Sequence, residues 1–372
     1  MADQIVAPGE EIKPKIRLAE AIALAEHLYG IDVCEAKELD GYDDKNYHLK
    51  AKSITNNKNI PHISPHGYVL KIMNSSDSEK IDCVQAQCEI MIHLGNNGIQ
   101  TPQPQKSTDG RLFCIQDLPQ NNKDNKPSKK HAVRLLTFVD GKMLKDLPWT
   151  LKFHFDVGVY TARLDLVLQN FSHPAYKQYS SLWMLKNMPT IEDYLFVFKE
   201  TDKRIEMVKE VVQSFKDQVL KNLGSLKSGM IHGDIHDQNL LCQLIDGEWS
   251  INAVLDFGDS HYSAYVIELA LATAYMILQS GLVESGTHVI AGYCSILPLP
   301  LDELKLLKVC VCARLCQSLV LGLYTHSLYP SNEYVLTTQA GGWQLLTQIW
   351  TMDGAALEKQ WFAQLPREYK IT

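Results

Sequence analysis

The sequence lacks a long uncharged apolar run and a segment of signal-peptide type. Residues 1–11 contain neither a basic stretch nor a long apolar one, so we expect no signal peptide. The longest uncharged apolar run, residues 269–283, is shorter than the roughly 20 residues that a membrane-spanning helix requires. We predict that this run forms a buried helix and that the protein has no membrane partner.

The sequence also lacks a surplus of positive charge. It has 36 Lys and Arg against 43 Asp and Glu, for a net charge of -7, and its basic residues are not clustered. This balance argues against nucleic acid as a partner and suits a small cationic substrate. With 372 residues, of which 45% are hydrophobic, the chain is long enough for two lobes with separate cores.

An even, regularly spaced set of cysteines is missing. The nine cysteines are odd in number and scattered, which is typical of free thiols in a reducing compartment and predicts a cytoplasmic protein. Cys310, Cys312 and Cys316 form the one cluster and could be interpreted as a metal site. In an apolar helix, however, positions 310 and 312 face different sides, which favours packing in the core.

What the sequence does contain is a concentration of chemically useful residues between 230 and 259. Asp234 is followed five residues later by Asn239, then by a turn at Asp246-Gly247, and then by Asp256 after an apolar run. We predict that Asp234 orients a substrate hydroxyl or accepts its proton. Asn239 and Asp256 offer the hard oxygen ligands that Mg²⁺ prefers. His-Gly-Asp alone is more typical of an ordinary turn, so the prediction depends on the whole pattern.

The motifs H-G-D-I-H-D-Q-N at 232–239 and L-D-F-G-D at 255–259 resemble those of the aminoglycoside phosphotransferase and choline kinase superfamily of small-molecule kinases. The resemblance implies an α+β, two-lobed protein-kinase-like fold. A small antiparallel sheet lobe would cover residues 1–137, and a mostly helical lobe residues 138–372. It also implies transfer of the γ-phosphoryl group of GTP or ATP, with Mg²⁺, to the hydroxyl of an amino alcohol.

The resemblance assigns phosphate-binding roles to residues near the N-terminus. Gly41 lies in a predicted hairpin that would cover the triphosphate, and Asn46 stands where relatives have Asn or Ser. Since the G-x-G-x-x-G of protein kinases is missing, an ordinary β-turn is the alternative. Lys71, inside an apolar strand, would bridge phosphates and pair with Glu89 of the next helix. An edge-strand lysine and a solvated glutamate are the alternatives.

The connector between the predicted lobes is assigned to the purine. The backbone groups of Thr137, Phe138 and Val139 would hydrogen-bond the base, and such groups serve adenine and guanine alike. The choice between GTP and ATP therefore stays open.

The acceptor is expected to be a small molecule because the chain lacks the parts that dock a peptide. No activation segment ending in Ala-Pro-Glu follows residue 259, and Gly233 stands where protein kinases have Arg. We interpret His232 and Gly233 as residues that shape the loop rather than react. Choline-, homoserine- and aminoglycoside-type acceptors all remain compatible with this pattern, and a non-catalytic scaffold would require a broken metal site.

Three further charged residues have more than one interpretation. Asp259 could hold the metal, contact the acceptor's amine or cap the next helix. Arg314 could bind an acceptor carboxylate through its planar fork or form a structural ion pair. Glu268 is interpreted as structural. In the same half of the chain, residues 191–223 carry a long amphipathic pattern of helical period.

Overall fold

The computed structural model describes residues 12–41, 43–119, 128–328, 330, 336–365 and 369. The chain divides into two compact units, Val6–Asp140 and Gly141–Thr372. We call them the sheet unit and the helical unit and describe each by itself. The division falls between residues 140 and 141, whereas the sequence pattern placed it between 137 and 138.

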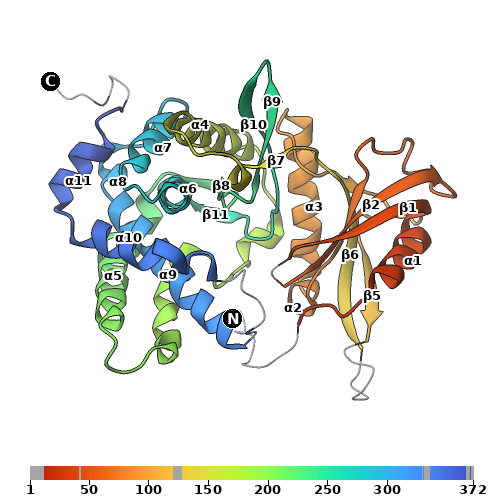
Figure 1. Ribbon diagram of the computed structural model, residues 1–372, viewed down its shortest axis with the longest axis horizontal. Coiled ribbons are helices and arrows are strands. Elements are labelled where there is room, and N and C mark those ends of the chain that lie inside the picture. Colours follow the sequence, from red (N-terminus) through yellow and green to blue (C-terminus); the bar gives the residue numbers. More distant parts are fainter. Residues whose placement is uncertain are drawn as a thin grey trace. The chain divides into compact units, whose positions relative to one another are not determined.

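The sheet unit is built on one antiparallel sheet (Figure 1). Its strands run in the spatial order β1-β2-β3-β6-β4, and β5 also pairs with β6. The strands are β1 (Ile31–Leu39), β2 (Lys45–Ile54), β3 (Tyr68–Ile72), β4 (Pro104–Gln105), β5 (Cys114–Leu118) and β6 (Lys129–Thr137).

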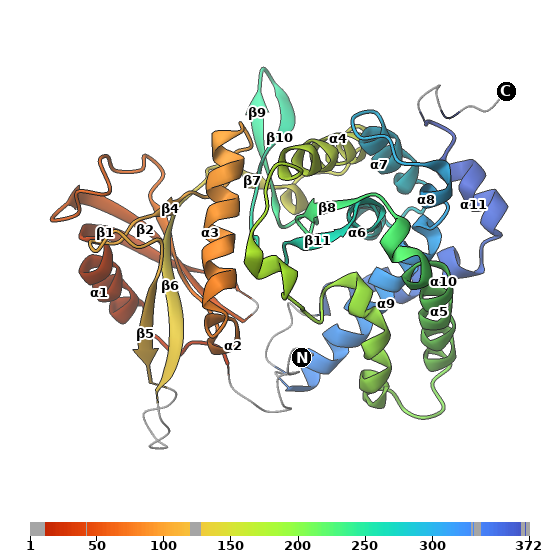
Figure 2. The ribbon, with the colours of Figure 1, turned by 180° about the vertical axis from the view of Figure 1, so that it is seen from behind.

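Helices cover both faces of this sheet. α1 (Leu18–Tyr29) and α3 (Ile81–Asn96) lie on opposite sides of it in both views, and α2 (Ser75–Ser78) is a short helix before α3 (Figures 1 and 2). Alternation along β6 explains the arrangement, because Val133 packs with α1 residues while Ala132 packs with Val84 of α3. The sheet unit therefore has apolar packing on each side of a single sheet.

The helical unit contains two small sheets among many helices. One sheet has the order β10-β9-β7 and the other pairs β11 with β8. These strands are β7 (Lys142–Met143), β8 (Ser228–Ile231), β9 (Leu240–Ile245), β10 (Glu248–Val254) and β11 (His261–Ala264). The α-helices are α4 (Leu151–Leu168), α5 (Arg204–Gln218), α6 (Tyr265–Ser280), α7 (Ser285–Cys294), α8 (Leu301–Leu304), α9 (Leu307–Leu328), α10 (Gln339–Thr351) and α11 (Gly354–Trp361). The 3₁₀ helices are η1 (Leu144–Asp146), η2 (Pro174–Lys177), η3 (Leu185–Val197) and η4 (Leu220–Ser225).

Two apolar helices form the centre of the helical unit. α6, seen end-on in Figure 1, is buried over most of its length, which confirms the prediction of a buried helix there. α9 packs against α5, α6 and α10, and Cys310, Cys312 and Cys316 are all fully buried in it. The stretch Leu301–Leu328 is long and apolar enough to cross a membrane, but 83% of its most apolar window is buried within the protein, as in the core helix of a globular domain.

The amphipathic pattern at residues 191–223 is divided among η3, α5 and η4. The chain continues η3 to Val197, leaves helical geometry, and begins α5 at Arg204. Asp202 accepts the backbone N–H of Arg204 at 2.9 Å, and this bond favours a new helix start over continuation.

Candidate active site

The β9–β10 hairpin brings the two predicted metal ligands to the same end. Its turn has left-handed backbone at Asp246 (φ 51°) and Gly247 (φ 84°), as a tight hairpin requires. Beyond the last paired residues, the backbone N–H of Leu255 donates to the carbonyl of Asn239 at 2.8 Å. Asp256 is the next residue, so Asn239 and Asp256 lie side by side in the backbone.

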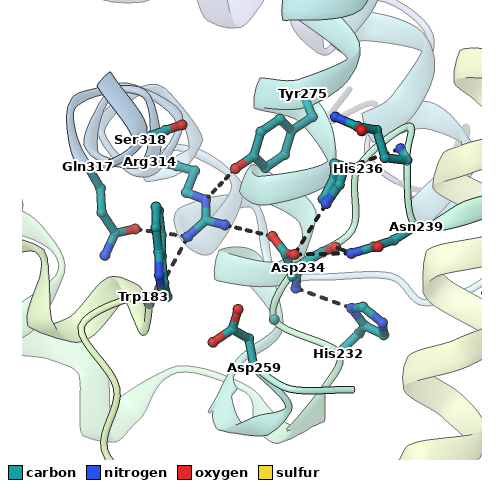
Figure 3. Close-up of polar contacts among 12 residues, drawn as sticks. Trp183, His232, Asp234, His236, Asn239, Asp259, Tyr275, Arg314, Gln317 and Ser318 are labelled. Carbon is teal, nitrogen blue, oxygen red and sulfur yellow. Dashed lines mark hydrogen bonds and ion pairs between the residues drawn. The ribbon is translucent and has the colours of Figure 1, made fainter. Parts of the chain in front are cut away.

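Asp234 lies next to Asn239 in the loop that precedes β9 (Figure 3). The amide nitrogen of Asn239 donates to the backbone carbonyl and to Oδ2 of Asp234, both at 3.0 Å. The Asp234 carboxylate also pairs with His236 Nε2 at 3.2 Å and Arg314 Nη2 at 2.8 Å. Its side chain keeps 23% of its surface exposed, so a substrate can reach it.

The surroundings keep Asp234 ionised. Burial by itself would raise the pKa of this carboxyl, but His236 and Arg314 outweigh that effect and hold the pKa below its usual range. Burial likewise disfavours the charged form of His236, yet Asp234 and Asp237 raise the pKa of the imidazole to about 9. At neutral pH the Asp234 carboxylate is therefore an anion that lies between two cations, His236 and Arg314.

Glu268 fixes the backbone that carries Asp234. Its carboxylate accepts the N–H groups of His232 at 2.9 Å and of Gly233 at 3.0 Å. Burial raises the pKa of Glu268 to about 7 although these two bonds oppose the shift. Gly233 has φ 82°, and a Cβ there would lie 2.4 Å from the Asp259 carbonyl, so this position requires glycine. The contacts agree with a structural role for Glu268, His232 and Gly233.

Asp256 occupies an unusual backbone position for a non-glycine residue, with φ 56°. Its Oδ1 accepts the N–H of Gly258 at 3.1 Å, which orients the carboxylate. The nitrogen of the Asn239 amide is used by Asp234, so the amide presents its oxygen as a ligand group. One carboxylate and one amide oxygen at one hairpin end fit the hard donors that Mg²⁺ takes.

In the sheet unit, Lys71 lies on β3 opposite Asn46 on β2. Its ammonium pairs with Asp44 Oδ2 at 3.1 Å, and its side chain is 12% exposed. No role was predicted for Asp44 from the sequence, although this residue stands directly before β2 and two positions from Asn46. Glu89 lies on α3 and accepts a bond from Gln85 at 2.8 Å, and its pairing with Lys71 stays a prediction.

Two side-chain hydrogen bonds hold the backbone of the turn between β1 and β2. Lys13 Nζ donates to the carbonyl of Gly41 at 2.7 Å, and Asn46 donates to the carbonyl of Asp40 at 3.3 Å. A Cβ on Gly41 would lie 2.6 Å from the Asp44 carbonyl, so the turn is too tight for a side chain at this position. Gly41 in the turn and Asn46 at the start of β2 thus lie close together, and their role toward phosphates stays a prediction.

The connector uses some of the groups that were assigned to the purine. The N–H of Thr137 donates to the Gln103 carbonyl, and the N–H of Phe138 donates to the Gly67 carbonyl, both at 2.9 Å. These two amides are therefore occupied within the sheet unit. Of the three predicted residues, Val139 is the one whose N–H could still serve a base as donor.

The contacts remove some of the alternative roles that the sequence left open for Arg314 and Asp259. Arg314 is paired with Asp234, so it is an ion-pair residue of the site. Asp259 does not cap α6, because that helix begins at Tyr265 after Ala264. In Figure 3 the Asp259 carboxylate lies between the side chains of Trp183 and Asp234. His236, Tyr275 and Trp183 are site residues for which no role was predicted from the sequence. Tyr275 and Trp183 lie outside the motifs, and His236 lies within residues 232–239 but was not singled out there.

An ionised Asp beside an Asn, with a second Asp at the end of the following hairpin, is the arrangement of enzymes that transfer a phosphoryl group to an alcohol. A sequence model of the phosphotransferase enzyme family matches residues 39–298, and the chain belongs to that family. The protein is therefore a kinase with an alcohol group as acceptor.

The individual relatives are more specific. The chain is 32% identical to hydroxylysine kinase of Bos taurus, with 94% of this chain and 93% of the relative covered. It is 30% identical to hydroxylysine kinase of Mus musculus over the same shares, and 32% identical to that of Xenopus laevis over 94% of each. These similarities confirm the superfamily that the motifs indicated.

Solved structures of small-molecule kinases share the fold. A microcompartment-associated aminopropanol kinase is 19% identical, with 90% of this chain and 98% of the other covered and a TM-score of 0.69. An amicoumacin kinase in complex with AMP-PNP and Ca²⁺ is 16% identical over 90% and 95%, with a TM-score of 0.62. The predicted α+β kinase-like fold, with its small antiparallel sheet and mostly helical remainder, is confirmed.

Proposed function

We propose that the protein transfers the γ-phosphoryl group of GTP to the hydroxyl of 5-hydroxy-L-lysine. The products are 5-phosphohydroxy-L-lysine and GDP, and the reaction belongs to the breakdown of lysine and hydroxylysine. Similarity to hydroxylysine kinases over nearly the whole chain supports this acceptor. The observation that carries the chemistry is the contact of Asp234 with Asn239, at the hairpin end where Asp256 also lies.

Asp234 acts on the acceptor hydroxyl. Since His236 and Arg314 keep its carboxylate ionised, Asp234 accepts a hydrogen bond from the hydroxyl and aims the oxygen at the γ-phosphorus. The transition state of phosphoryl transfer is loose, so the hydroxyl proton moves to Asp234 late, as the new P–O bond forms.

Asn239 and Asp256 hold Mg²⁺ in this proposal. The metal, when bound, neutralises negative charge on the phosphates. In the sheet unit, Lys71 gives its ammonium to the phosphates and Glu89 orients it, while the turn with Gly41 and Asn46 covers them.

Val139 binds the purine through its backbone, because the amides of Thr137 and Phe138 are occupied. We place the reaction in the cytoplasm, and the nine free cysteines support a reducing compartment.

The test is release of nucleoside diphosphate by the purified protein with Mg²⁺ and either GTP or ATP. The acceptor panel contains 5-hydroxylysine, lysine, choline, homoserine and an aminoglycoside. Lysine is the matched control because it differs from the proposed acceptor only by the missing hydroxyl. We expect release with 5-hydroxylysine and none above background with lysine, and a higher kcat/KM with GTP than with ATP.

Other outcomes would redirect the proposal. Release with choline or homoserine but not with 5-hydroxylysine would reassign the acceptor. Equal release with 5-hydroxylysine and with lysine would mean that water is the acceptor. No release with any compound would favour a non-catalytic scaffold.

A further inference from the structure

Helix α9 places one arginine in the active site. Arg314 is 2% exposed and lies in a helix whose other inward residues are almost all apolar. A buried guanidinium is costly unless its N–H groups are satisfied and its charge is matched. The partners of Arg314 therefore indicate what this side chain is for.

Arg314 donates four hydrogen bonds, three of them to other parts of the helical unit and one to Gln317 of its own helix (Figure 3). Nη2 donates to Asp234 Oδ1 at 2.8 Å, and Nε donates to the hydroxyl of Tyr275 on α6 at 3.2 Å. Nη1 donates to the Trp183 carbonyl at 3.2 Å and to Gln317 Oε1 at 3.0 Å. These bonds use four of the five N–H groups, so the fork is not available to grip an acceptor carboxylate with two bonds.

The segment 179–183 is attached to the site at further points. Gln317, one turn after Arg314 on α9, donates to the Leu182 carbonyl at 2.7 Å. The hydroxyl of Tyr179 donates to the Gly258 carbonyl at 3.0 Å, two residues after Asp256. The guanidinium of Arg314 also lies over the ring of Trp183, with 5.2 Å between its central carbon and the ring centroid. This segment therefore contacts both the loop after β10 and the arginine that holds Asp234.

Arg314 completes the fixation of the Asp234 carboxylate. Oδ2 is held by Asn239 and His236, both of the same loop, whereas Oδ1 is held by Arg314 from α9. Without Arg314, the two oxygens could rotate about the bond to Cβ.

We propose that Arg314 is a positioning residue, which fixes Asp234 in the orientation that receives the acceptor hydroxyl and holds segment 179–183 as the wall of the acceptor site. This inference rests on the proposed function of Asp234. A positioning role and a purely structural role predict different effects of substitution. Loss of positioning lowers kcat while the folded protein still binds nucleotide.

The main test compares R314K with R204A. Lysine keeps the charge but cannot reach Asp234, Tyr275 and Trp183 together, since it lacks the planar fork. Arg204 is the matched control, because it also pairs with an aspartate, Asp202 at 2.6 Å, and also lies over an aromatic ring. Its partners Asp202, Phe198 and Trp343 lie outside the loop of residues 232–239.

We expect R314K to lower kcat about 100-fold, the scale of a 1 Å displacement of a catalytic group, with the nucleotide KM within about threefold of wild type. R204A should keep kcat within about threefold. A folded R314K protein with wild-type kcat would overturn the inference, and so would an equal loss in R204A.

Two further measurements separate positioning from folding. In R314A, millimolar guanidinium should restore part of kcat, and no restoration in a protein with a wild-type circular dichroism spectrum would count against the proposal. If R314A does not fold, the R314K result decides. Hydrogen exchange of residues 179–187 should be faster in R314K than in R204A, and unchanged exchange would overturn the link to this segment. This readout needs no turnover, so an inactive wild-type protein would refute the proposed function while leaving the link testable.

Discussion

The two units hold their key charged side chains in different ways. In the helical unit, Asp234 is bound by three side chains, and one of them, Arg314, comes from 80 positions further along the chain. In the sheet unit, Lys71 pairs with Asp44 from the turn before the adjacent strand. The first charge is fixed by tertiary packing of α9, and the second by strand register. We expect the first to be intolerant of change and the second to be adjustable.

The largest effect should follow from removing Asp234 itself. D234A leaves the acceptor hydroxyl without its orienting carboxylate, so we expect kcat to fall by about 10³- to 10⁴-fold. Nucleotide binding should be largely kept, because the metal ligands and Lys71 remain. The measurement is steady-state turnover together with titration of a fluorescent nucleotide. D202A, which removes the carboxylate that pairs with the partly exposed Arg204, is the control.

If D234A turned over normally, Asp234 would have no role in the reaction. The comparison between the two units would then lose its catalytic meaning and describe only two ion pairs.

The second effect concerns the stability of the Asp234 loop. The pKa of His236 is raised to about 9 in the folded protein from 6.5, so its charged form stabilises the fold fully below pH 6.5. This contribution is lost as the pH rises through 9. H236Q should remove it, at most about 3 kcal/mol from 1.36 kcal/mol for each pH unit. The measurement is urea denaturation of wild type and H236Q at several pH values between 6 and 10.

The two proteins should differ most at pH 6 and converge toward pH 10. A constant difference across this range would show that His236 stabilises the loop without its charge. Asp234 would then depend on Arg314 and Asn239 alone.

A third and smaller effect tests the metal ligands. D256A removes the carboxylate at the end of β10 while leaving the β9–β10 pairing intact, so we expect Mg²⁺-dependent nucleotide binding to weaken by about 10- to 100-fold. Calorimetric titration with and without Mg²⁺ measures this directly. The weakening should be seen only with Mg²⁺, and equal loss without the metal would contradict the ligand assignment.

The contrast between tertiary packing and strand register also separates what could be predicted from the sequence from what could not. The fold class was implied by the resemblance of the motifs to a known family. The hairpin turn at Asp246-Gly247 and the proximity of Asn239 to Asp256 follow from short-range patterns, in which turn chemistry and residue spacing suffice. The ion pair of Arg314 with Asp234 could not be predicted, because α9 is apolar nearly all round and its packing angle decides which residue meets the loop. The division of residues 191–223 into separate helices also has a local reason, the bond that Asp202 accepts from the N–H of Arg204.

Asp44 is an intermediate case. Its position directly before β2 could be predicted from the sequence, but no motif singles it out as a partner of Lys71. Its carboxylate meets Lys71 with one oxygen and accepts the N–H of Asn74 with the other at 2.8 Å. D44N keeps an acceptor for Asn74 and removes the charge that competes with phosphates for Lys71. We therefore expect the smallest effect, a decrease of the nucleotide KM by about fivefold, or about 1 kcal/mol, with kcat nearly unchanged.

D77N is the control for this variant, because Asp77 also bonds Asn74, at 2.7 Å, and its charge is lost in the same way. The KM of D77N should stay near that of wild type, and the decrease in D44N should shrink at high salt, where charge interactions are screened. A higher KM in D44N would mean that Asp44 positions Lys71 instead of competing for it. The sheet unit would then resemble the helical unit, with a fixed charge in place of an adjustable one.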